Sequence, residues 1–81
     1  MSENGVSIVL ETMAKALEVP KDQLSAESSM QNQPAWDSLG HLNLLVALDK
    51  RFSGRVANIS ELAKATSVRE IAEILQRHGL L

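Results

Sequence analysis

The chain has 81 residues, the length of one small domain, and it contains no cysteine that could staple a thin core. Eight basic and ten acidic residues give a formal net charge of −2, and the aromatic residues are one tryptophan and one phenylalanine. This balance argues against a nucleic-acid binder, which usually carries a basic stripe and aromatic platforms for the bases.

Targeting and membrane-spanning segments are not expected. No apolar run approaches the ~18–20 residues of a membrane helix, and no basic segment precedes an apolar stretch at the N-terminus. The absence of cysteine fits a reducing compartment. We therefore expect a cytoplasmic monomer with neither a signal peptide nor a membrane span.

The first helix is predicted over about residues 6–18. Its apolar residues recur at spacings of three and four along one stripe: Val6, Val9, Leu10, Met13, Ala16 and Leu17. The helix is expected to end before Pro20, which lacks the backbone donor that a helix needs and restricts the residue preceding it. The polar residues 1–5 are expected to fray.

A long connection is predicted over residues 19–36, because this part of the chain is rich in turn residues and has no helical or strand period. Leu24, Met30 and Trp36 are its large apolar residues, and we expect them to anchor the loop to the core. Trp36 could instead contact a partner, although a lone tryptophan is usually largely buried.

The second helix is predicted over residues 38–52, with Gly54 as its C-terminal cap. It carries two apolar stripes. The stripe expected to face the core consists of Leu44, Leu45, Leu48 and Phe52. The second stripe consists of Leu39, Leu42 and Val46. A small domain cannot easily bury both, so one of them should face something other than the core.

Two further helix starts are predicted. Asn58 and Glu61 have the spacing of a capping box that opens a short third helix reaching about Lys64, and Ser67 and Glu70 have the same spacing. The last helix has an apolar face of Val68, Ile71, Ala72 and Leu75, and Gly79 ends it. Together these segments predict an all-α fold, a small antiparallel four-helix bundle with a long first loop and a short third helix, in a single domain.

The segment Asp37-Ser38-Leu39 opens an apolar helix that continues through Ala47-Leu48 to Phe52, and this pattern resembles the signature of acyl carrier proteins. The resemblance extends from about Val6 to Leu75. It implies that Ser38 carries a 4′-phosphopantetheine arm, which a separate phosphopantetheinyl transferase takes from coenzyme A. It also implies that the thiol of the arm holds acyl groups as thioesters. Asp37 would help to cap the helix and, with Leu39, to present the serine.

The residue type itself suits this role. A serine at a helix N-terminus places a phosphodiester beside free backbone N–H groups and the positive end of the helix dipole. The alternative is that Ser38 is an ordinary capping residue, since Asp and Ser are both favoured at helix starts.

Partner enzymes would dock on the second stripe beside the arm, with Asn43 and Lys50 at its margin. These partners include a loading ligase for acyl or aminoacyl groups and the synthases and transferases that use the cargo. We expect Leu42 and Val46 to be exposed and Leu39 both to pack and to dock. The alternative is that the stripe packs under the first loop or the third helix.

The charge of the second helix differs from that of the family it resembles. Carrier proteins of bacterial fatty acid synthesis have a strongly acidic second helix, whereas residues 38–56 here contain Asp49 against Lys50, Arg51 and Arg55. This predicts a specialised carrier whose partners are recognised by shape or by acidic patches. Gly40 costs the helix about 1 kcal/mol relative to alanine. It could reflect the close approach of a partner or of the arm, or drift.

Catalysis and metal binding are not expected. Ser38, His41 and Asp37 lie close together in sequence, but a small helical bundle offers no obvious pocket for a catalytic triad. His41 is expected to be a partly buried helix residue and His78 a C-terminal capping residue, and two distant histidines do not make a metal site. The predicted function is therefore a non-catalytic acyl carrier of fatty acid, polyketide or related specialised biosynthesis. The alternatives are a peptidyl or aminoacyl carrier, and an unmodified adaptor that binds partners through Leu42 and Val46.

Overall fold

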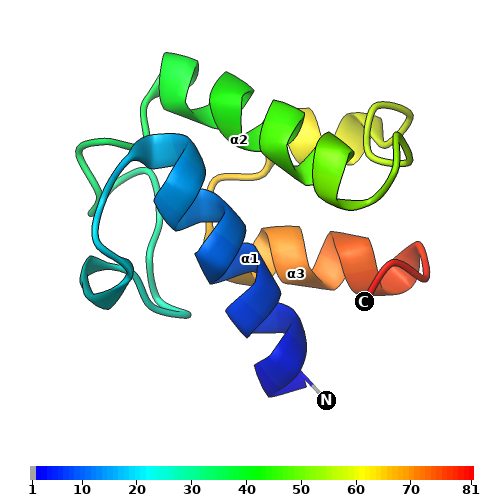
Figure 1. Cartoon of the computed structure of the whole chain (residues 1–81), viewed down its shortest axis with the longest axis horizontal. Coiled ribbons are helices and arrows are strands. Elements are labelled where there is room, and N and C mark those ends of the chain that lie inside the picture. The colour runs from blue at the N-terminus through cyan, green and yellow to red at the C-terminus, as the bar shows by residue number, and fades with distance from the viewer. Residues whose placement is uncertain (1) are drawn as a thin grey trace.

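The computed structural model describes residues 2–81, and side chains from Gly5 onward. Its α-helices are α1 (Ser2–Leu17), α2 (Ser38–Arg51) and α3 (Val68–Arg77), and two 3-10 helices, η1 (Lys21–Gln23) and η2 (Ser60–Lys64), lie in the connections. In Figure 1, α2 lies across the top of the view, α3 lies below it and α1 crosses between them. The predicted all-helical class is confirmed for the described residues.

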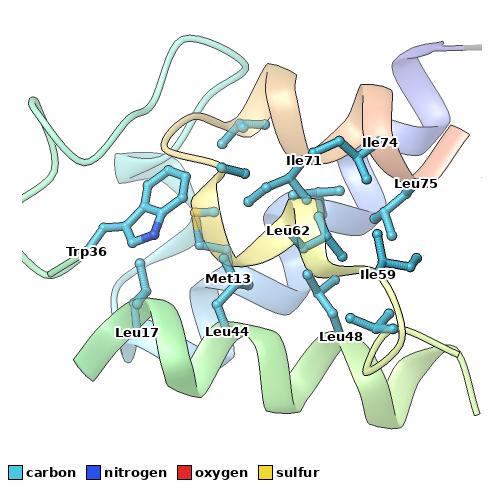
Figure 2. Close-up of a cluster of buried hydrophobic side chains, with 14 of the residues drawn as sticks. Met13, Leu17, Trp36, Leu44, Leu48, Ile59, Leu62, Ile71, Ile74 and Leu75 are labelled. Atoms are coloured by element: carbon cyan, nitrogen blue, oxygen red, sulfur yellow. The ribbon is translucent and has the colours of Figure 1, made fainter. Parts of the chain in front are cut away.

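The helix α1 is central to the packing, because it contacts both α2 and α3, and η2 also contacts both of those helices. One hydrophobic core joins all four segments (Figure 2). Its fully buried large side chains include Met13 of α1, Leu44 and Leu48 of α2, Leu62 of η2 and Ile71 and Leu75 of α3. The predicted core faces of the three α-helices are therefore in place.

The helix α1 begins at Ser2, earlier than the predicted start near Val6. Met1 lies outside the described residues, and fraying of residues 1–5 stays a prediction. At the other end, Glu18 takes a left-handed conformation with φ of 58°, and the Val19 N–H donates to the Ala14 carbonyl over 3.1 Å. This closing bond satisfies one of the last carbonyls of the helix, and Pro20 follows as predicted.

The long loop from Glu18 to Asp37 is tied to the body of the domain in the way the sequence predicts. Leu24 and Trp36 are buried, and Met30 is partly buried against the core. The loop also pairs with the segment before α3, where an isolated antiparallel bridge joins Ser29 and Ser67. These anchors hold the loop across one end of the helices, so that Trp36 occupies one end of the core cluster in Figure 2.

The C-cap residue of α2 is Phe52, two residues before the predicted Gly54. Ser53 is the first residue in the left-handed region, with φ of 59°, and Gly54 follows with φ of 82°. The Gly54 N–H donates to the Asp49 carbonyl over 2.8 Å, which closes the helix end. Gly79 does occupy the left-handed position after α3, with φ of 75°.

The third helical segment also differs from the prediction. The structure has a 3-10 helix there, and its N-cap is Ile59 without a side-chain hydrogen bond, so the predicted capping box at Asn58 is wrong. The box before α3 is present in a shifted form. The Ser67 hydroxyl accepts from the Glu70 N–H over 3.2 Å, whereas the Glu70 carboxylate accepts from the Thr66 N–H over 2.7 Å.

None of the helices described over residues 2–81 has the length and apolar character needed to cross a bilayer.

Candidate functional site

Ser38 is the first residue of α2, and Asp37 caps the helix in front of it. Asp37 has an extended backbone, and its carboxylate accepts a hydrogen bond from the Gly40 N–H over 2.8 Å. This is the geometry of an N-cap residue. Ser38 itself is exposed and does not serve as the cap. The interpretation of Ser38 as an ordinary capping residue therefore loses its support, because the neighbouring aspartate performs that task.

The first turn of α2 presents backbone donors beside Ser38. The His41 N–H makes the first helical bond, to the Asp37 carbonyl over 2.7 Å, and the Gly40 N–H is taken by the Asp37 carboxylate. The N–H groups of Ser38 and Leu39 precede these bonds and have no partner within the helix. An anionic group attached to Ser38 would lie near these donors and near the positive end of the helix dipole.

Gly40 is explained by the fold of the chain itself. A β-carbon at this position would overlap the Ala35 carbonyl oxygen and would approach Leu17 Cδ2 to 2.8 Å. The loop therefore crosses the first turn of α2 so closely that only glycine fits. The contact is intramolecular, so the sequence-based explanations by a partner, by the arm or by drift are not needed.

The second apolar stripe of α2 lies on the surface. The side chains of Leu39, Leu42 and Val46 are 66%, 57% and 50% exposed, whereas Leu44 and Leu48 on the same helix are completely buried. The predicted exposure of Leu42 and Val46 is confirmed. Leu39 is the most exposed of the three, so the expectation that it also packs inside the protein is wrong. We call Leu39, Leu42 and Val46 the exposed stripe.

A groove of about 340 Å³ adjoins the exposed stripe between α2 and η2. Val46 belongs to both the stripe and the groove. The other apolar side chains of its wall include Leu45 from α2, Val56 and Ile59 from the connection, and Ala63 from η2. The surface next to Ser38 is therefore apolar along α2, and the groove lies at the end of the exposed stripe that is farther from Ser38.

The charges around the stripe are predominantly basic at the C-terminal end of α2. Asp49 Oδ1 accepts from the N–H groups of Val56 and Ala57 over 3.1 and 2.9 Å, so this carboxylate is engaged in holding the following turn. Lys50, Arg51 and Arg55 are exposed, as is Asn43 beside the stripe, and no ion pair of these three cations is found with residues 5–81.

The ring of His41 points into the protein and does not serve Ser38. Nδ1 accepts from the Trp36 indole N–H over 3.0 Å, and Nε2 lies 2.8 Å from the Leu62 carbonyl oxygen. Both ring nitrogens are thus engaged, and the side chain is buried rather than partly buried as predicted. A serine nucleophile needs a base with a free nitrogen directed at its hydroxyl, and His41 offers none in this arrangement.

His78 is the C-cap residue of α3, as predicted, and its ring contacts η2. His78 Nε2 and Arg77 Nη1 each lie 3.1 Å from a carboxylate oxygen of Glu61. Hydrogen bonds from His78 and then Arg77 hold the pKa of Glu61 below its ordinary value. This cluster joins η2 to the end of α3 and lies outside the Ser38 turn. Among the described residues, no group of three or more His, Cys, Asp or Glu side chains is placed to hold a metal ion.

The pairing of Trp36 with His41 was not predicted from the sequence. Its signal would have been a polar residue at a buried position of α2, five residues after a tryptophan that also needs a hydrogen-bond partner. Neither a family model nor a solved structure matches this chain. The function must therefore be argued from the residues and their arrangement.

Proposed function

We propose that this protein is an acyl carrier protein, modified at Ser38 with 4′-phosphopantetheine from coenzyme A. The observation that carries the proposal is the combination at the start of α2. Ser38 is exposed at the first helical position, Asp37 caps the helix in its place, and the exposed stripe begins at the next residue. A separate phosphopantetheinyl transferase would activate the hydroxyl, so the domain needs no base of its own.

The arm would hold acyl groups as thioesters and move them between enzymes of fatty acid, polyketide or related specialised biosynthesis. The carrier would act as a cytoplasmic monomer without catalysing a reaction. The finer fold assignment belongs to the same proposal: a four-helix bundle in which η2 takes the place of the short third helix. A peptidyl or aminoacyl carrier shares all of these features and differs only in its cargo and its loading ligase.

Partner enzymes would dock on the exposed stripe, with Asn43 and Lys50 at its margin. Apolar side chains that are about half exposed or more on one helix face are suited to burial against a partner. Asp49 is held by backbone N–H groups, and the three cations Lys50, Arg51 and Arg55 outnumber it at this end of α2. We therefore expect partners with carboxylates at the corresponding places, and electrostatic steering opposite in sign to that of an acidic carrier helix.

The test is the intact mass of the protein after incubation with coenzyme A and a promiscuous phosphopantetheinyl transferase. We expect a mass gain of one phosphopantetheine group in the natural protein and none in Ser38→Ala. Ser60→Ala is the matched control, because Ser60 is also an exposed serine at the first position of a helical segment. It should be modified like the natural protein.

An unmodified adaptor that binds partners through Leu42 and Val46 is the alternative from another functional class, and it shares the exposed stripe. No mass gain with several transferases, for a protein shown to be folded by circular dichroism, would contradict the carrier proposal and favour the adaptor.

A further inference from the structure

His41 joins three separate parts of the structure through its two ring nitrogens. It lies in the first turn of α2, three residues after Ser38, and its side chain is 8% exposed. One nitrogen accepts from Trp36 in the loop, and the other contacts the carbonyl of Leu62 in η2. Trp36 and Leu62 are each 1% exposed, so both hydrogen bonds are shielded from water.

The chemistry of the two partners determines the tautomer of the ring. A backbone carbonyl can only accept, so Nε2 must carry the proton that is donated to Leu62. An indole N–H can only donate, so Nδ1 must present its lone pair to Trp36. The neutral Nε2–H tautomer satisfies both bonds. In the other neutral tautomer and in the imidazolium, Nδ1 would carry a hydrogen that faces the indole N–H of Trp36, so that two donors would meet. No buried side-chain nitrogen or oxygen lacks a partner among the described residues.

The same bonds bracket the proposed modification site. Trp36 lies two residues before Ser38 and His41 three residues after it, and their rings stack with centroids 6.0 Å apart at 25°. The Trp36–His41 bond therefore closes the chain around Ser38. The His41–Leu62 bond then attaches this closed turn to η2, whose Ala63 lines the groove beside the exposed stripe.

We propose that His41 is a positioning residue that holds the Ser38 turn through Trp36 and holds η2 through Leu62, in a single neutral tautomer. Ser38 and the exposed stripe would then keep a fixed relative position when a transferase or a partner enzyme binds. The effect on phosphopantetheine transfer rests on the proposed function, whereas the positioning of the two segments does not.

Two variants separate the two bonds. In His41→Asn, the side-chain oxygen lies near the position of Nδ1 and can accept from Trp36, but no atom reaches Leu62. In His41→Gln, the terminal amide lies near the position of Nε2 and can donate to Leu62, but Trp36 loses its acceptor. Ile71→Val is the stability control, because it removes one buried methylene in α3 and touches neither bond.

Amide hydrogen exchange of the unmodified protein measures how firmly the Ser38 turn and η2 are each held. We expect His41→Asn to speed exchange at the Leu62 N–H, and His41→Gln to speed exchange at the Gly40 N–H, each about tenfold beyond the change in Ile71→Val. Long-range proton–nitrogen spectra of the natural protein should show the Nε2–H tautomer at neutral pH. The other tautomer, or exchange changes no different from those of Ile71→Val, would overturn the proposal.

The kinetics of phosphopantetheine transfer test the functional part of the proposal. His41→Gln should lower kcat about tenfold by loosening the serine, and His41→Asn should raise KM for the carrier about tenfold by freeing η2. Any other pattern, in a natural protein that is modified, would overturn the positioning role in transfer. If the natural protein is not modified at all, the proposed function fails, and the exchange and tautomer measurements decide the positioning role by themselves.

Discussion

The backbone carbonyl oxygen of Ala35 lies so close to Gly40 that a β-carbon on residue 40 would overlap it. The two atoms would be separated by well under 3.0 Å, a distance below which β-carbon contacts essentially never occur. This contact presses the end of the long loop against the first turn of α2. It therefore helps to define the position of Asp37 and Ser38, which lie between the two residues.

Gly40→Ala should destabilise the protein although alanine is the better helix former. The gain in helix propensity is about 1 kcal/mol, and overpacking against a backbone atom costs about 1–3 kcal/mol. We expect a net loss in the free energy of unfolding in urea, together with slower modification of Ser38. Asn43→Ala is the control for stability alone, because this exposed position of α2 should gain a few tenths of a kcal/mol in helix propensity. A Gly40→Ala variant that is more stable than the natural protein would contradict the close approach.

Asp37→Ala should lose the cap of α2, whereas Asp37→Asn should keep it, because the amide oxygen can still accept from the Gly40 N–H. The expected cost of the alanine variant is about 1 kcal/mol, and that of the asparagine variant is a few tenths. Urea denaturation of the two variants measures the difference. Equal losses in both would show that the charge of Asp37, and not its hydrogen bond, stabilises the turn.

Leu42→Ala and Leu44→Ala compare two leucines that lie two residues apart on α2 and differ in exposure, 57% against 0%. Leu42→Ala should change the free energy of unfolding by about 0.5 kcal/mol or less, and Leu44→Ala should reduce it by about 2–5 kcal/mol. Leu42→Ala should at the same time raise KM with a partner enzyme that docks on the exposed stripe. A large stability loss in Leu42→Ala would mean that the stripe packs inside the protein.

Glu70 should make the stability of the protein depend on pH. Hydrogen bonds from the backbone and the hydroxyl of Thr66 lower the pKa of its carboxyl group below the ordinary value. The ionised group is favoured in the folded state, so its contribution is fully present above the ordinary pKa and is lost as the pH falls through the lower, folded pKa. The stability advantage of the natural protein over Glu70→Gln should therefore be largest near pH 7 and shrink toward about pH 3.

Ser67→Ala is the control for this pH dependence, because the Ser67 hydroxyl caps the same helix end without titrating. It should cost about 0.5–2 kcal/mol at both pH values. The measurement is urea denaturation at the two pH values. A constant difference between the natural protein and Glu70→Gln would rule out a titrating contribution from this carboxylate.

The sequence predicts well what depends on residues a few positions apart. The apolar spacing along α1, α2 and α3 predicts their core faces, and the two-stripe pattern of α2 predicts that Leu42 and Val46 are exposed. The resemblance implies that Asp37 helps to cap α2, and the structure has the cap at this residue. These features follow from the helical period of 3.6 residues and from hydrogen bonds within one turn, so the local sequence contains the information.

Two of the predictions that failed concern the ends of elements. Ser53 rather than Gly54 takes the first left-handed position after α2, and η2 has no side-chain cap at its start. The turn after α2 and the segment η2 are both short, and residues outside them fix their conformation. The Asp49 carboxylate binds the N–H groups of Val56 and Ala57, and the burial of Leu62 ties η2 to the core. Tertiary contacts of this kind override local propensity.

The sequence by itself therefore determined the helical class, the placement of Ser38 at a helix start and the exposed stripe beside it. The tertiary structure alone decided that Gly40 is required by Ala35, and that His41 bonds both Trp36 and Leu62. The reason is physical: periodicity and capping act within a turn of helix, whereas these contacts arise only when the loop and η2 pack against the first turn of α2. A buried polar ring must then find its partners wherever the fold has brought them.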